Sequence, residues 1–217
     1  MAKEKLFTPY QLFIIAVLAF LQFTIILDFM VLSPLGAQLL QELHINTRQF
    51  GWVVSAYAFS AGAAGLMAAG FADRYDRKRL LLFFYAGFIL GTFLCGIAPN
   101  YPFLLLARIV TGLFGGVVGS VIFAIVTDLF ALQVRGRVMG IVQMAFASSQ
   151  VLGLPVGLYL ANLWGWHAPF LLIVGLSILA FLAIVWKMKP IDAHLHLQGS
   201  HSALAHFGKT VSKRRYL

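Results

Sequence analysis

The sequence is poor in charge, above all in acidic residues, and it has a single cysteine. Only 11% of its 217 residues are charged and seven are Asp or Glu, whereas 61% are hydrophobic and 20 are Phe. A soluble domain is about 25% charged and roughly 45–50% apolar. The lone Cys95 excludes a disulfide scaffold, and its apolar surroundings indicate an inert, packed thiol. The composition therefore excludes an ordinary soluble enzyme and a disordered chain.

Long hydrophobic runs are what the sequence has in abundance. A helix needs about 20 apolar residues to cross a bilayer, and these runs lack the alternation of barrel strands. The first run is too long for a signal peptide, and no small-residue cleavage site follows it. The sequence predicts an all-α polytopic membrane protein with six transmembrane helices. We place them at residues 10–32, 50–71, 80–98, 102–126, 138–163 and 169–186.

The positive charges are distributed unevenly about these spans. Of 16 Lys and Arg residues, all except Arg48 and Arg108 fall on one side if the spans alternate in direction. The positive-inside rule then places both termini in the cytoplasm. We predict a cytoplasmic N-terminus over residues 1–9, a membrane domain over 10–186 and a basic cytoplasmic tail over 187–217. The net charge of +9 is thereby explained by topology, and a nucleic-acid partner is not expected.

Two ionisable residues lie well inside the predicted spans, where a charge is costly and usually marks a functional site. Asp28 precedes Pro34 by six residues, and Arg108 follows Pro102 by six. At 1.5 Å per residue both lie about 9 Å below their proline, so they share a depth. Either they face a common cavity as a pair or proton-sensitive switch, or they form a purely structural ion pair. Amide side chains that could line the cavity, or else join helices, are Gln22, Gln143 and Gln150.

Small residues and one proline mark two further spans. In the fourth span, a stripe of glycines predicts a close helix–helix approach. In the fifth span, a proline flanked by glycines predicts a kink near the outer end of the helix, because proline removes a backbone donor. The kink is either static or a point at which the helix bends when the protein changes conformation. The residues concerned are Gly112, Gly115 and Gly119 in the stripe, and Gly153, Pro155 and Gly157 at the kink.

The short connection between the second and third spans is dense in charges of both signs. Asp73 ends a helix, where a carboxylate opposes the helix dipole and needs a basic partner or another helix N-terminus. The connection resembles the signature loop of the major facilitator superfamily, G-x-L-A-D-R-x-G-R-K. Ala69 and Asp76 stand where that signature has its two glycines. The matching residues are Asp73, Arg74, Arg77 and Lys78.

Further segments are similar to the same superfamily. Residues 106–112 around Arg108 resemble its fourth-helix motif, residues 135–140 resemble the entry to its fifth helix, and residues 153–157 resemble its antiporter motif. The resemblance implies a secondary transporter whose halves rock about a midplane site, each half built from inverted three-helix repeats. It also implies that the loop of Asp73 is a conformational latch. The first-helix acid makes proton-coupled drug or sugar efflux permeases the most similar members.

The resemblance sets further expectations. Such transporters have about twelve spans, so we expect this chain to be an N-terminal half that works with a second six-helix half. We expect a multi-pass protein of the cell (inner or plasma) membrane that moves a small molecule and draws energy from the proton gradient, with no cofactor. Alternatives are a proton-coupled uptake permease, and a non-transporting remnant or assembly subunit. No metal-ligand cluster or nucleophile motif occurs, so an enzyme is not expected.

Overall fold

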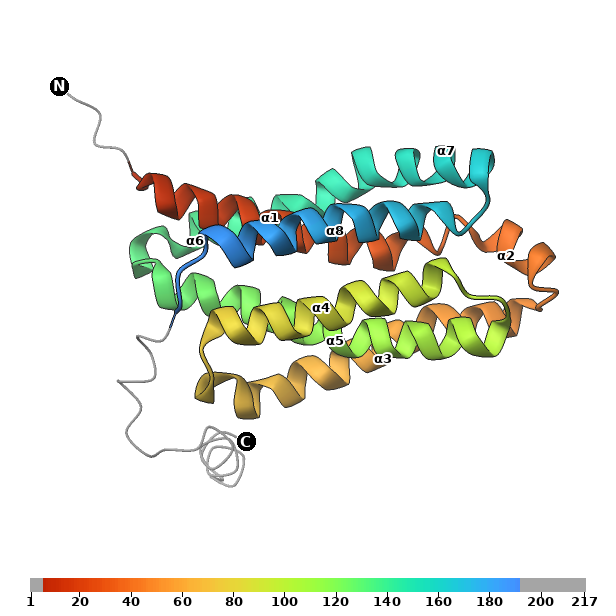
Figure 1. The fold of residues 1–217 in the computed structure, drawn as a ribbon, viewed down its shortest axis with the longest axis horizontal. Coiled ribbons are helices and arrows are strands. Elements are labelled where there is room, and N and C mark those ends of the chain that lie inside the picture. Colours follow the sequence, from red (N-terminus) through yellow and green to blue (C-terminus); the bar gives the residue numbers. More distant parts are fainter. Residues whose placement is uncertain (1–5, 192–217) are drawn as a thin grey trace, which may run out of the picture.

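The computed structural model describes residues 6–191, and these form a bundle of helices with no strand (Figure 1). Six helical spans are long and apolar enough to cross a membrane, as the hydrophobic runs predicted. The fifth span consists of two helices joined by a π-helical turn, η2 (Ser149–Gly153). The spans are α1 (Pro9–Val31), α3 (Thr47–Phe71), α4 (Arg77–Gly96), α5 (Tyr101–Leu129), α6 (Leu132–Ser148) with α7 (Leu154–Trp164), and α8 (Ala168–Lys187).

Two short helices were not predicted. They are α2 (Gly36–Glu42), between α1 and α3, and a single 3₁₀ turn, η1 (Ala72–Arg74), before α4. Seven and three residues are too few to leave a periodic hydrophobic signal. The turn η1 carries the aspartate of the signature-like loop, so it belongs to the candidate site described below.

Polar caps fix where several spans begin. Thr8 and Asn46 each accept a hydrogen bond from the third residue of their helix, and the side chain of that residue bonds back to the cap. Asp76 and Asn100 cap α4 and α5, because their side-chain oxygens accept hydrogen bonds from the backbone N–H groups of Arg79 and Phe103. Such caps satisfy backbone N–H groups that have no partner within the helix. For this reason α3 and α4 begin three residues before the hydrophobic runs that predicted them.

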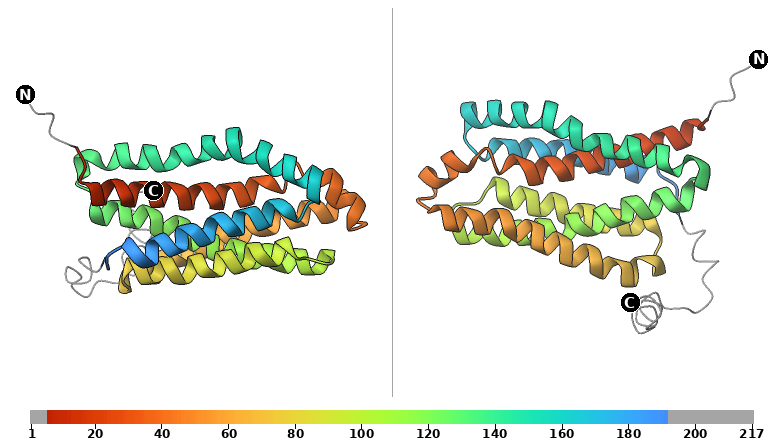
Figure 2. Two further views of the ribbon diagram at one scale, coloured as in Figure 1. Left: turned by 45° about the horizontal axis from the view of Figure 1, so that its top comes forward. Right: turned by 180° about the vertical axis from the view of Figure 1, so that it is seen from behind.

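The helices pack as two equivalent triplets. The first triplet is α1, α3 and α4, and the second is α5, α6–α7 and α8. Extensive contacts join α3 to α5, α4 to α5, α1 to α6, α1 to α8 and α4 to α8 (Figure 2). In this comparison α1 corresponds to α5, α3 to α6–α7 and α4 to α8. The contact of α3 with α5 then corresponds to that of α6 with α1, and the contact of α4 with α5 to that of α8 with α1. The predicted 3+3 repeat is therefore visible in the packing.

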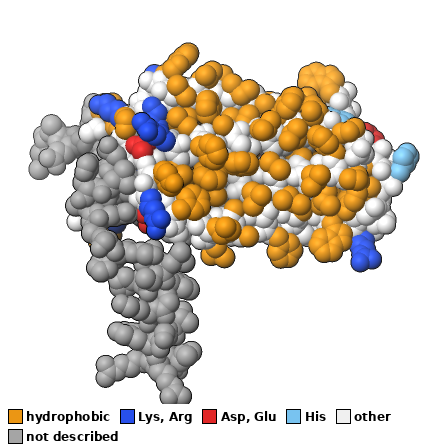
Figure 3. All heavy atoms as spheres, turned by 60° about the horizontal axis from the view of Figure 1, so that its bottom comes forward, with side chains coloured by type: hydrophobic (Ala, Val, Ile, Leu, Met, Phe, Trp, Pro, Cys, Tyr) orange, Lys and Arg blue, Asp and Glu red, His pale blue; other side chains and the backbone are white. Residues whose placement is uncertain are grey.

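The outer surface of the bundle is apolar, and its basic side chains gather at one end. Figure 3 shows hydrophobic side chains along the body and Lys or Arg side chains mainly at one end. We call this the basic end. It holds the described residues Arg74, Arg79, Arg137 and Lys187, and Arg48 at the first turn of α3 lies at the opposite end.

The equivalent spans α3 and α6–α7 are the least covered by the rest of the chain. Only 22% of the most apolar window of α3 and 28% of that of α6–α7 are buried, against 50% for α1, α4 and α5. Both carry large exposed side chains, such as Phe59 at 75% and Leu152 at 63%. These two faces are free to contact lipid or another helical domain.

The chain that leaves α8 is tied to the connection between α3 and α4. The Ile191 carbonyl accepts a hydrogen bond from the Arg77 backbone, and the Ile191 N–H donates to Asp76 Oδ2 at 2.8 Å. The Lys78 ammonium donates to the carbonyls of Val185 and Met188 at the end of α8. Residues 187–191 are thus fixed in place. Most of the predicted tail (187–217) and residues 1–5 lie outside the described residues.

Candidate functional site

The two charges predicted at equal depth meet inside the bundle. Arg108 Nη1 lies 2.7 Å from Asp28 Oδ2, and both side chains are fully buried. The same nitrogen donates to the Asp28 carbonyl at 3.3 Å. The pair joins α1 to α5, the corresponding helices of the two triplets. It forms wholly within the described chain, and both partners are shielded from solvent by the helices around them.

An aromatic ring from α3 completes the surroundings of the guanidinium. Arg108 Cζ lies 4.4 Å from the centre of the Tyr57 ring, a cation–π distance. Arg108 Nε and Nη2 and Tyr57 Oη are buried and make no hydrogen bond among the described residues. Buried polar atoms are nearly always bonded. The site thus contains unused donors in an apolar interior, which can take a different partner if the pair opens.

The glycines of α5 allow α3 to bring Tyr57 this close. A Cβ on Gly112 would lie 2.5 Å from the Tyr57 carbonyl oxygen, and one on Gly115 would lie 2.9 Å from Tyr57 Oη. The next contact along the helix is made by Gly116, which faces the Ala61 carbonyl. Gly119 has no atom within 4 Å of its Cβ position, so it takes no part in this contact. Of the three predicted glycines, Gly112 and Gly115 contact α3 and Gly119 does not. Gly116, which was not predicted, continues the contact four residues after Gly112.

The interrupted fifth span packs against α1 beside Asp28. A Cβ on Gly153 would lie 2.6 Å from Leu27 Cδ1, and one on Gly157 would lie 3.0 Å from Val31 Cγ2. Pro155 lies in the first turn of α7, directly after the π turn. Because proline has no N–H and its ring collides with the preceding turn, the regular ladder cannot pass through it. The predicted interruption is present here as a π turn, a feature frequent at functional sites.

The three glutamines predicted as cavity lining lie in different environments. Gln22, on α1, is half-buried, and its Oε1 has no hydrogen-bond partner among the described residues. Gln150 is half-buried in the π turn, and Gln143 is exposed on α6. None of them contacts Asp28 or Arg108 through a hydrogen bond within the described part of the chain. Their role stays a prediction.

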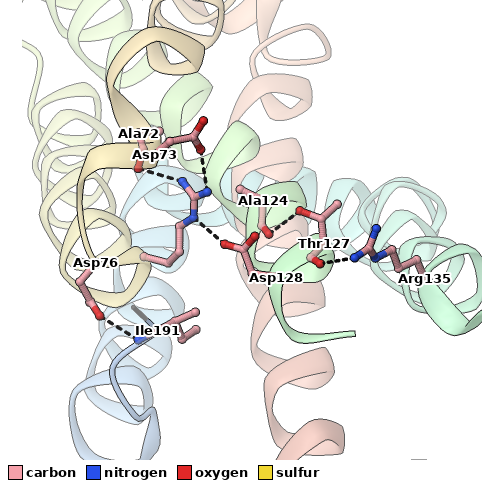
Figure 4. Close-up of polar contacts among 9 residues, drawn as sticks. Ala72, Asp73, Asp76, Ala124, Thr127, Asp128, Arg135 and Ile191 are labelled. Carbon is pink, nitrogen blue, oxygen red and sulfur yellow. Dashed lines mark hydrogen bonds and ion pairs between the residues drawn. The ribbon is translucent and has the colours of Figure 1, made fainter. Parts of the chain in front are cut away.

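A second arginine, Arg77, joins several elements at the basic end through partners that Figure 4 labels as Ala72, Asp73 and Asp128. Arg77 Nη2 lies 2.7 Å from Asp73 Oδ1, Nε lies 2.8 Å from Asp128 Oδ2, and Nη1 donates to the Ala72 carbonyl at 2.8 Å. The Arg77 side chain is only 4% exposed, against 51% for Asp73. This arrangement links the end of α3, the start of α4 and the end of α5. Asp73 thus has the basic partner that its place at a helix end required.

Sequence reasoning missed Asp128. It lies in the last turn of α5, where a carboxylate opposes the helix dipole, just as Asp73 does at the end of α3. The same signal that singled out Asp73 could therefore have found it. The other basic loop residues differ: Lys78 caps α8, and the Arg74 side chain is exposed and forms no ion pair among the described residues.

The site offers no ligands for a metal. Within residues 6–191, no group of three or more His, Cys, Asp or Glu side chains is placed to hold an ion. The site consists of a buried carboxylate paired with a buried guanidinium beside the Tyr57 ring, together with a charged network at one end of the bundle.

Comparison with known sequences identifies the family. The profile of the Major Facilitator Superfamily matches residues 18–216. The chain belongs to this superfamily. The superfamily is one of membrane transporters and not of enzymes, and efflux and multidrug proteins are among the relatives of this chain.

Two curated relatives illustrate the range of similarity. The chain is 37% identical to a Bacillus subtilis protein named "Uncharacterized MFS-type transporter YceJ", over 78% of this chain and 43% of that protein. It is 32% identical to Bacillus subtilis "Multidrug resistance protein 3", over 67% of this chain and 28% of that protein. The chain thus spans less than half the length of either relative.

Solved structures agree on the fold. The chain superposes on a proton:xylose symporter of the superfamily, XylE, with a TM-score of 0.76 and 15% sequence identity. The match covers 87% of this chain and 46% of that one. At this identity the likeness concerns the fold alone.

Proposed function

We propose that the chain belongs to a proton-coupled permease that exports small molecules, with Asp28 as the proton-binding group. The observation that carries this proposal is the fully buried Asp28–Arg108 pair in the membrane part of the bundle. A charge at such depth is retained mainly in ion and substrate pathways or in relays. Efflux is preferred to uptake because several relatives are named multidrug resistance proteins or efflux pumps, against one that is named an amino acid uptake transporter.

Protonation of Asp28 is the step that links the gradient to movement. A neutral Asp28 no longer balances the Arg108 charge, and the guanidinium already has two nitrogens without a hydrogen bond. Arg108 then gains free energy by turning toward water or a substrate, because an unpaired buried charge is strongly unfavourable. The proton gradient supplies the energy, and no cofactor is required.

The network around Arg77 serves as the latch of this cycle. It fixes the ends of α3 and α5 to the start of α4, and Asp73 keeps half of its side-chain surface exposed. An exposed carboxylate at a helix end can bond a second domain in one state and release it in another. Arg77 and Asp128 hold that carboxylate in position, whereas Arg74 and Lys78 add positive charge around it.

The transporting unit contains a second six-helix half. The chain spans less than half the length of its relatives, and α3 and α6–α7 leave broad apolar faces uncovered. The protein lies in the cell (inner or plasma) membrane, and its basic end faces the cytoplasm by the positive-inside rule.

The test is transport driven by an imposed proton gradient. The gene product that contains this chain is reconstituted into liposomes, and ethidium flux and internal pH are followed together. Asp28→Asn is expected to abolish coupled flux, a loss of at least about 100-fold, because it removes the proton-binding group. Glu42→Gln, the same chemical change at an exposed site on α2, is the control and keeps full flux.

Three outcomes contradict parts of the proposal. Unchanged flux in Asp28→Asn excludes Asp28 as the proton-binding group. Ethidium entry along the proton gradient, in place of export, indicates an uptake permease. Ethidium leakage that is equal in the unmodified protein and in Asp28→Asn, with no change of internal pH, identifies a non-transporting remnant or assembly subunit.

A further inference from the structure

A groove of about 840 Å³ opens at the basic end, outside both arginine networks described above. It lies between the end of α3, the first two turns of α4 and the chain that leaves α8. Its wall combines positive charge with aromatic rings. The lining residues are Phe71, Arg74, Tyr75, Asp76, Arg79, Leu80, Phe83, Phe84 and Pro190.

The two arginines of the groove, Arg74 and Arg79, have no ion-pair partner among the described residues. The neighbouring basic residues are engaged inside the protein, since Arg77 binds two carboxylates and Lys78 caps α8. Arg74 and Arg79 are exposed, and neither side chain forms an ion pair among the described residues. Asp76, the acid of the groove, accepts hydrogen bonds from the backbone N–H groups of residues 79 and 191.

The apolar part of the groove lies one helical turn away from this charge. Phe83 follows Arg79 by four residues on α4, so both project on the same face, and Phe83 is 66% exposed. The Phe83 ring packs against the rings of Phe84 and Phe114, and the three ring centroids lie 5.2 to 6.2 Å apart. The charge thus lies at the end of the bundle, and the aromatic surface continues from it toward the middle of the membrane.

We propose that this groove binds an anionic phospholipid of the leaflet at the basic end. Arg74 and Arg79 take the phosphate and headgroup, and an acyl chain follows the exposed Phe83 face. Basic pockets beside membrane helices recognise such headgroups, and the vertical order of charge and aromatic surface matches the order within a lipid. The chain's own residues 192–217 are a poor occupant, because their Lys209, Lys213, Arg214 and Arg215 carry the same sign as the groove.

The test counts bound lipid by native mass spectrometry of the full 217-residue chain in detergent. Dioleoyl-phosphatidylglycerol is expected to bind more tightly than dioleoyl-phosphatidylcholine. Arg74→Gln combined with Arg79→Gln should weaken phosphatidylglycerol binding about 10- to 30-fold, from roughly 1 kcal/mol for each basic residue. Phe83→Gln should weaken it as well, and should leave binding of soluble glycerol phosphate unchanged.

The control removes the same charge elsewhere. Arg48→Gln combined with Arg137→Gln alters exposed arginines at the two ends of the bundle, outside the groove, and should leave phosphatidylglycerol binding within about twofold. An equal loss in this control overturns the proposal, since it indicates diffuse attraction. Equal binding of phosphatidylcholine overturns it too. Displacement of the lipid by millimolar inorganic phosphate alone also overturns it, because a simple anion site needs no acyl chain.

Discussion

The two arginines that are buried in the described part of the chain are bonded to very different extents. Each of the three nitrogens of Arg77 has a partner, two carboxylates and a carbonyl, at 2.7–2.8 Å. Arg108 uses one nitrogen, on Asp28, and leaves Nε and Nη2 without a hydrogen bond. A guanidinium has five N–H donors in a fixed fork. Bonds from all three nitrogens of Arg77 hold three helix ends together, whereas bonds from one nitrogen of Arg108 leave a group that can change partners.

Helix α5 connects the two regions. It carries Arg108 in its N-terminal half and Asp128 in its last turn, and its glycines hold α3 in close contact between them. Both regions are thus in contact with α5 and α3, the Asp28–Arg108 pair through Arg108 and Tyr57 and the Arg77 network through Asp128 and Ala72. The comparison predicts that the arginines respond differently to the same substitutions.

The largest expected effect comes from removing one partner of the fully buried pair. Arg108→Met should lower the free energy of unfolding by about 3–5 kcal/mol, because it leaves Asp28 unpaired in an apolar interior. Adding Asp28→Leu should recover most of that loss. In contrast, adding Asp128→Leu to Arg77→Met should not, since Asp73 and the Ala72 carbonyl still lack a donor. Unfolding in mixed micelles titrated with SDS measures all four variants, and equal recovery at both sites contradicts the comparison.

Exchanging arginine for lysine should give an intermediate effect that distinguishes the sites. A lysine ammonium is a compact charge and cannot reach three separate acceptors in the directions of a guanidinium. Arg77→Lys should lower stability by about 1.5–3 kcal/mol, the value of a hydrogen bond to a charged group. Arg108 donates to Asp28 through one nitrogen only, which an ammonium can replace, so Arg108→Lys should lose less. The same micelle titration decides, and a larger loss at position 108 would show that its fork is in use.

The smallest expected effect concerns the contact between α3 and α5. Gly112→Ala places a methyl group against Ser60 and the Tyr57 backbone, and such overpacking lowers stability by about 1–3 kcal/mol. It should also shift the Tyr57 ring away from Arg108, which tyrosine absorbance and fluorescence report. Gly119→Ala is the matched control, because it meets open space, and it should be neutral or stabilise the helix by up to about 1 kcal/mol.

Several features of the site could be predicted from particular residues. Equal distances from Pro34 and Pro102 indicated that Asp28 and Arg108 share a depth, and they form a pair. The position of Asp73 at a helix end required a partner, and Arg77 supplies it. Asp128 was not singled out because it lies beyond the end of the predicted fourth span (102–126), although its place at a helix end carries the same signal as that of Asp73. The contact of the Tyr57 ring with Arg108 and the contact of Gly116 with Ala61 depend on the rotation of each helix, which the sequence does not give.

The sequence by itself determined the six spans, their alternation across a membrane and the end at which the basic residues gather. These properties follow from local hydrophobicity, helix length and charge position, which add along the chain and do not depend on neighbouring helices. The tertiary structure alone decided which faces meet. That choice depends on the rotation and register of each helix, which contacts as small as Gly112 against Tyr57 and Gly153 against Leu27 fix. For this reason the depth of Arg108 was predictable, and the number of its bonds was not.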